Sequence, residues 1–133
     1  MSRGEDKINE IETYLGELES LLPLDFEEYK RDFKTKAACE RYFEKIIESV
    51  IDLAFIFIKE RNFKIPEEDK QAFDILKEEK IISEKLAEKL KDAKGMRNVI
   101  AHEYGKIDDE LVFEAITEQL EKDVREFINS LKA

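Results

Sequence analysis

The sequence predicts an all-α protein, an up-and-down bundle of about four long helices with one or two short helices. Only 4 Gly and 2 Pro occur among 133 residues, so few residues would interrupt a helix. Glu, Lys, Leu and Ile are abundant, which also favours helices. Apolar residues recur at spacings of three and four over four long stretches, as in helices with one buried face. The length suits one domain, which we expect to cover residues 1–133.

The first predicted helix covers residues 6–22 and carries a single apolar stripe. The stripe consists of Ile8, Ile11, Leu15, Leu18 and Leu22. Pro23 is expected to end this helix, because proline cannot continue the hydrogen-bond ladder. A short helix is predicted over residues 24–34, where Asp25 and Glu28 have the spacing of a capping box.

A second long helix is predicted over residues 35–61. Its C-terminal half is apolar on almost every side, which is typical of a helix at the centre of a bundle or in an interface. Two acids interrupt this pattern: Glu48 and Asp52 are four residues apart and share a face. Either they face water, or one or both orient a basic group on a neighbouring helix.

Two further helix starts are marked by local signals. Pro66, followed by three acidic residues, predicts the first turn of a short helix. Ser83 is the expected N-cap of a long helix that starts at Glu84 and ends near residue 101 or 104. Gly95 lies inside that helix and costs it roughly 1 kcal/mol of helix propensity, a cost that a close approach by another backbone would justify.

The last predicted helix follows a short break. Gly105 is expected to end the preceding helix. Asp108 is expected to cap a final helix that runs to residue 131. No internal repeat or linker separates these segments, so the short connections favour antiparallel neighbours.

Charge and cysteine content restrict the function. A net charge of -10 argues against broad, non-specific binding of nucleic acid. A group of basic residues could still admit a polyanion locally, although acids interleave with them as on an ordinary helix surface. The group is Lys85, Lys89, Lys91, Lys94, Arg97 and Lys106. The single cysteine, Cys39, excludes an internal disulfide and is expected to fill the core.

The sequence shows neither a secretory signal nor a membrane span. No apolar run approaches the ~18–20 residues that a spanning helix needs, and no hydrophobic signal segment is visible at the N-terminus. We therefore expect a cytoplasmic protein that does not engage a membrane.

The segment from Arg97 to Tyr104 carries the residues best suited to chemistry on a phosphodiester. Arginine can hold phosphate oxygens with a planar fork of donors. His102, the only histidine, can transfer a proton near neutral pH. Asn98 and His102 share a helix face, whereas Arg97 and His102 point about 140° apart in a regular helix. The geometry permits a site without requiring one, and His102 could equally be a C-terminal cap.

A single histidine per chain also predicts an oligomer. Cleavage of RNA by its own 2′-hydroxyl needs a base for that hydroxyl and an acid for the leaving oxygen. One histidine cannot easily perform both roles at once. A two-fold homodimer would bring two copies of Arg97 and His102 together, so we expect any catalytic site to lie at a dimer interface.

The chain resembles a known family in these same residues. Arg97, His102 and Tyr104 match the Rx4HxY signature of the HepT-like branch of HEPN-domain proteins. The segments 95–104, 38–54 and 73–83 are also similar to that family. The resemblance extends over nearly the whole chain, in the same order.

The resemblance implies a function and a partner. HepT-like proteins are dimeric helical bundles that act as toxins in type VII HepT/MntA toxin–antitoxin systems. The toxin is a metal-independent endoribonuclease without a cofactor, acting on tRNA or mRNA. The antitoxin MntA, a minimal nucleotidyltransferase, silences it by AMPylation of the motif tyrosine. By resemblance, Arg97 and His102 are catalytic and Tyr104 is the AMPylated residue.

The residues themselves support further, less specific predictions. Asn98, Glu48 and Asp52 are candidate supporting residues for the site, and no metal ligand set is expected. One alternative function is a non-catalytic helical binding module that docks the nucleotidyltransferase, with the motif serving only for modification. Another is a plain dimeric bundle in which His102 caps a helix.

Overall fold

The structure, a computed structural model, describes residues 2–133 except for the side chain of Tyr104. The helices in chain order are α1 (Arg3–Leu21), α2 (Phe26–Arg31), α3 (Phe33–Glu60), α4 (Asp69–Glu78), α5 (Glu84–His102), the 3-10 helix η1 (Tyr104–Lys106), α6 (Asp109–Glu114), the π-helix η2 (Ala115–Gln119) and α7 (Leu120–Lys132). Residues 2–133 contain no strand, which confirms the predicted all-α class.

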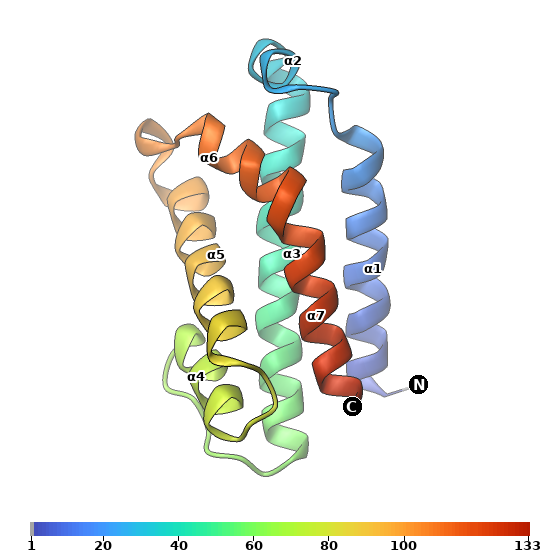
Figure 1. The fold of residues 1–133 in the computed structure, drawn as a ribbon, viewed down its shortest axis with the longest axis vertical. Helices are drawn as coiled ribbons and strands as arrows, with labels where there is room; N and C mark the ends of the chain where they lie inside the picture. The colour runs from blue at the N-terminus through green and yellow to red at the C-terminus, as the bar shows by residue number, and fades with distance from the viewer. Residues whose placement is uncertain (1) are drawn as a thin grey trace.

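The long helices alternate in direction around α3, as Figure 1 shows. The chain rises along α1, descends along α3, rises along α5 and descends through α6, η2 and α7. The short helices α2 and α4 lie at opposite ends of the bundle. The predicted up-and-down arrangement is therefore confirmed, and the most apolar helix, α3, contributes more buried residues than any other helix.

The predicted caps explain where several helices begin. The Asp25 carboxylate accepts the amide N–H of Glu28 at 2.9 Å, at the start of α2. The Ser83 hydroxyl oxygen accepts the amide N–H of Leu86 at 3.0 Å, at the start of α5. Asp108 caps α6 in the same way. These side chains satisfy amide groups that have no partner within the helix, so short polar residues fix the boundaries.

The start of α4 differs from the prediction. Pro66 does not lie in the first turn, because α4 begins at Asp69 and Glu68 occupies the cap position. Pro66 is buried instead, in the extended segment before the helix. The amide of Glu67 donates to the Gln71 side chain at 2.6 Å, which closes the turn between the buried proline and the helix.

The expectations for two glycines are wrong. Gly105 does not end α5, because the helix ends at His102 and Gly105 lies inside η1. A β-carbon added at Gly95 would meet the Lys70 amine at 3.8 Å, an ordinary van der Waals distance. No backbone therefore requires a glycine at position 95.

The last predicted helix is divided by the π-helix η2. Its apolar stripe explains the wider turn: Val112, Ile116, Leu120 and Val124 are spaced by four residues, and all four are buried. A spacing of four overshoots one α-helical turn by ~40°, so three such steps would carry the stripe off the core. A π-helix has more residues per turn, which takes up the excess rotation.

The position of Cys39 and the apolar content of the helices agree with what the sequence predicts. Cys39 is fully buried in the core, as predicted. Burial and, to a smaller extent, the nearby Glu40 carboxylate together raise the pKa of its thiol to about 11. Such a thiol is largely protonated and unreactive at neutral pH. Among residues 2–133, no helix is both long enough and apolar enough to cross a bilayer.

Candidate functional site

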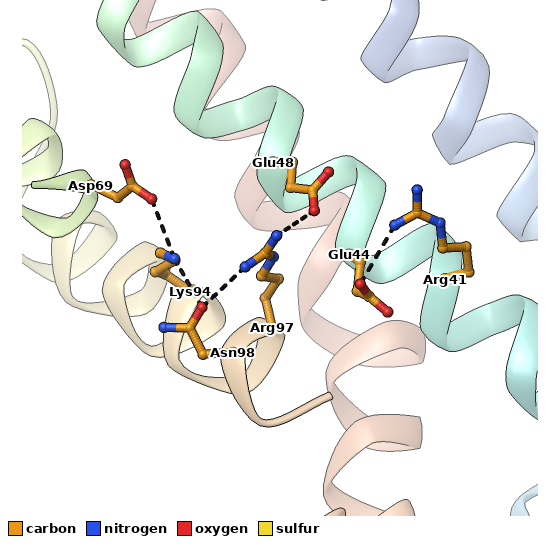
Figure 2. A network of polar contacts seen from close by, with 7 residues as sticks. All are labelled: Arg41, Glu44, Glu48, Asp69, Lys94, Arg97 and Asn98. Carbon is orange, nitrogen blue, oxygen red and sulfur yellow. Dashed lines mark hydrogen bonds and ion pairs between the residues drawn. The ribbon is translucent and has the colours of Figure 1, made fainter. Parts of the chain in front are cut away.

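Arg97 lies on the face of α5 that packs against α3. Its guanidinium forms an ion pair with the Glu48 carboxylate through Nη2 and donates to the Asn98 side-chain oxygen from Nη1 at 3.2 Å. Figure 2 shows Arg97 between these two residues. The side chain of Arg97 is 20% exposed, so the pair lies at the edge of the core. Of the two interpretations of Glu48, this contact favours the one in which the acid orients a basic group of the motif helix.

Asn98 connects Arg97 to a second cation that the sequence analysis did not assign to the site. The Lys94 amine donates to the Asn98 side-chain oxygen at 2.9 Å and pairs with Asp69 of α4 at 3.3 Å (Figure 2). The Lys94–Asn98 spacing of four residues was visible in the sequence, but the contact with Asp69 depends on how α4 packs. Three helices thus fix the orientation of this polar cluster.

Asp52 is not brought to the cluster. Its carboxylate lies 3.5 Å from the Lys7 amine of α1 and is 61% exposed. Four residues along α3 rotate the side-chain direction by ~40°, which moves Asp52 away from α5 and toward α1. Of the two acids that share a face of α3, only Glu48 therefore contacts the motif helix.

His102 is the last residue of α5 and is exposed. Its ring makes no hydrogen bond to any residue that the structure describes. The expected ~140° between Arg97 and His102 is consistent with a half-buried arginine and an exposed histidine. Within one chain, the structure unites Arg97, Asn98 and Glu48 and leaves His102 apart at the end of the helix.

The chain turns sharply directly after His102. Glu103 ends α5 with its amide donating to the Val99 carbonyl at 2.8 Å, and η1 begins at Tyr104. The backbone of Tyr104 is thus two residues beyond the exposed histidine. The predicted role of the Tyr104 side chain falls outside the described part of the molecule.

Arg97 retains one unused donor. Its Nε is buried and has no hydrogen-bond partner among the described residues. An unpaired buried donor costs about 1–3 kcal/mol. The guanidinium charge is meanwhile balanced by Glu48, so a phosphate group that binds Arg97 must share the guanidinium with that carboxylate.

The basic group, which lies on α5 and η1, does not form an uncompensated positive patch. Five of its six members pair with carboxylates within 4 Å. The pairs are Lys89–Asp123, Lys91–Asp74, Lys94–Asp69, Arg97–Glu48 and Lys106–Glu103. Most of these acids lie on other helices. The run of basic residues along the sequence therefore suggests more local positive charge than the folded protein has.

This fold and this site together define a class of protein. It is an up-and-down helical bundle that carries Arg-x4-His-x-Tyr across the end of a long helix, the arrangement expected from the resemblance to HepT-like proteins. Residues 11–131 match the family model described as ribonuclease HepT-like. The chain therefore belongs to the ribonuclease HepT-like family.

Individual relatives agree with that membership. The mRNA nuclease HepT of Shewanella oneidensis is 27% identical over 109 residues, which cover 82% of this chain and 81% of that protein. A putative RNase of Archaeoglobus fulgidus is 39% identical over 72 residues, 54% of each chain. The solved structure of the tri-AMPylated Shewanella oneidensis HEPN toxin in complex with an MNT antitoxin superimposes with a TM-score of 0.91. It is 24% identical, covers 99% of this chain and 98% of that one, and confirms the fold.

Proposed function

We propose that this protein is the toxin of a type VII HepT/MntA toxin–antitoxin system and an endoribonuclease that cleaves tRNA or mRNA without a metal ion. The observation that carries the proposal is Arg97-x4-His102-x-Tyr104 across the end of α5, in a chain of the ribonuclease HepT-like family. Relatives named mRNA nuclease and tRNA nuclease support an RNA substrate. The domain is proposed to comprise residues 1–133.

Arg97 and His102 have different roles in the proposed cleavage of RNA. Arg97 stabilises the negative charge that develops on the phosphate during cleavage. His102 transfers a proton, and its exposed position leaves its ring open to the substrate. Glu48 and Asn98 hold the guanidinium of Arg97 in one orientation.

A homodimer completes the site in this proposal. Arg97 and His102 of one chain face different directions, and each chain contains one histidine. A two-fold axis near the end of α5 would place both residues of one protomer beside those of its partner. The second histidine then supplies the proton transfer that the first cannot perform.

Tyr104 is the proposed point of control. A minimal nucleotidyltransferase partner is expected to add AMP to it, in keeping with the AMPylated relative solved with its MNT antitoxin. Each AMP adds a negative charge and a bulky nucleoside two residues beyond His102. An RNA backbone approaching His102 would then meet repulsion and lose space.

Expression of the toxin without its partner tests the nuclease. Wild type, His102→Ala and the matched control Glu103→Gln are compared by growth and by mapping 3′ ends in total RNA. Glu103 is exposed, and among the described residues its carboxylate pairs with Lys106 alone, so its variant should behave as wild type. Growth arrest and new RNA ends are expected in wild type and Glu103→Gln. Equal arrest and cleavage by His102→Ala would refute the assigned role of His102.

Intact mass tests the modification. The chain co-expressed with its partner should gain mass in steps of one AMP unit, and Tyr104→Phe should gain none. Of the three remaining tyrosines, Tyr14 and Tyr42 are partly exposed and Tyr29 is fully buried. Steps that persist in Tyr104→Phe would place the modification elsewhere.

A non-catalytic module that docks the nucleotidyltransferase is the second candidate. It is favoured by the separation of His102 from Arg97 within the single chain. A folded dimer that neither arrests growth nor cleaves RNA, yet binds its partner, would support this alternative. Both candidates predict that His102→Ala leaves partner binding intact.

A further inference from the structure

A groove separate from the Arg97–Glu48 cluster runs between α5 and the segment formed by η2 and α7. Its volume is about 270 Å³. Phe43 and Ile47 of α3 form its floor, and both are almost fully buried. Ala93 and Met96 line the α5 wall, and Val124 lines the opposite wall. The groove is therefore apolar along most of its length.

One acid interrupts this apolar lining. Asp123 lies in the apolar stripe of α7, and the residue is only 8% exposed. Its Oδ1 is buried and accepts no hydrogen bond from the described residues. The nearest cation is the Lys89 amine at 3.6 Å, which is too long for a hydrogen bond. Asp123 is therefore ion-paired with Lys89, but its Oδ1 lacks a hydrogen-bond donor, which is costly for a buried carboxylate.

The π-helix opens the groove beside that acceptor. Ala115 and Gln119, the first and last residues of η2, both line it. The small side chains of Ala115 and Ala93 face the same space, which leaves room for a guest. A π-helical turn within an α-helix frequently marks a functional site.

We propose that this groove binds a small organic cation, a primary amine on an apolar body. The ammonium group donates to the Asp123 carboxylate, and the apolar part packs on Phe43, Ile47 and Met96. Charge favours a cation, because Asp92 and Asp123 line the groove with only one lysine, Lys89. The volume lies slightly below the range typical of drug-sized ligands, so a guest of roughly ten non-hydrogen atoms fits. The binding site does not depend on the proposed nuclease function.

The chain offers a reporter inside the groove. It contains two methionines, Met1 and Met96, so labelling with 13C-methyl methionine gives two signals, of which one lies in the groove. The probe is 2-phenylethylamine, and its neutral counterpart is 2-phenylethanol. We expect a saturable shift of the Met96 methyl signal with the amine, and about tenfold weaker binding of the alcohol, because hydrogen bonds to charged groups are the stronger ones.

Three variants locate the binding. Asp123→Asn preserves size and should reduce the affinity for the amine to that for the alcohol. Glu126→Gln removes the same charge from an exposed position of α7 and should change nothing. Ala93→Phe fills the groove and should abolish the shift with both probes, independently of the carboxylate. Circular dichroism checks that each variant is folded.

Three outcomes would overturn the proposal. The first is a Met96 signal that shows no saturable shift with the amine. The second is an unchanged preference for the amine in Asp123→Asn. The third is a shift that follows protein concentration rather than amine concentration, since a second copy of the chain would then occupy the groove. None of these outcomes bears on growth arrest by the wild-type toxin.

Discussion

Glu48 is the residue through which the central helix α3 contacts Arg97 of the motif. Four residues separate it from Asp52, yet only Glu48 contacts Arg97, while Asp52 pairs with Lys7. The sequence placed both acids on one face of a helix and could not choose between them. The choice depends on the rotation of α3 relative to α5, which is set by packing in the whole bundle rather than by local sequence.

Glu48→Ala should reduce RNA cleavage by about tenfold, equivalent to roughly 1.4 kcal/mol of transition-state stabilisation, because Arg97 loses the partner that orients it. Stability should fall by less than about 1 kcal/mol, since the Glu48 side chain is 40% exposed and screened by water. Asp52→Ala is the matched control and should cleave RNA as the wild type does. Equal losses in the two variants would contradict the role of Glu48.

Glu40 supplies a prediction on pH. Burial raises the pKa of its carboxyl, the Asp109 and Glu44 carboxylates raise it further, and Lys36 opposes them. The folded state therefore holds the proton more tightly than the unfolded state, so Glu40 lowers stability as pH rises through its folded pKa. Glu40→Gln should raise the thermal midpoint at pH 7 and lose this advantage at pH values below 4. If Glu40→Gln stabilised the protein more in acid than at pH 7, this explanation of the pH dependence would be contradicted.

At the scale of the element, α5 is the helix whose start and end the sequence predicts best. Ser83 was predicted as its N-cap and is one, and its end at His102 lies within the predicted range. These features are local, because a cap and an apolar stripe act within a few residues. The division of the last helix by η2 was missed, although the run of four-residue spacings in its stripe contained the signal.

Ser83→Ala should lower the free energy of unfolding by about 1 kcal/mol, because the amide of Leu86 loses its acceptor. Ser20→Ala is the control: its hydroxyl donates to the Glu17 carbonyl near the end of α1 and caps no helix N-terminus. It should change stability by no more than ~0.5 kcal/mol. Urea unfolding followed by circular dichroism measures both. Equal effects would show that the cap contributes little.

At the scale of the whole molecule, the fold could be predicted from the sequence and the site only in part. Helical stripes and few breakers define the bundle, and α3 is apolar enough to be placed at its centre. The contacts Lys94–Asp69 and Lys89–Asp123 join residues of different helices, and no local pattern in the sequence predicts them. Asp123 in particular reads in sequence as one more surface acid of a charged helix.

The proposed dimer makes activity depend on protein concentration. Specific cleavage activity should fall on dilution through the range in which sedimentation velocity shows dissociation, because one chain presents only one His102. A His102→Ala sample should dissociate over the same range. Full activity from a chain that sediments as a monomer would contradict a site shared between protomers.

The positions of the first and last helices have a practical consequence. Arg3 begins α1 and Lys132 ends α7 at the same end of the bundle, opposite the end where α5 finishes at His102 (Figure 1). Any polypeptide attached before Arg3 or after Lys132 therefore starts a full helix length away from the motif. A fluorescent protein or an affinity tag fused at either terminus would leave the end of α5 unobstructed, which makes the protein suited to tracking in living cells.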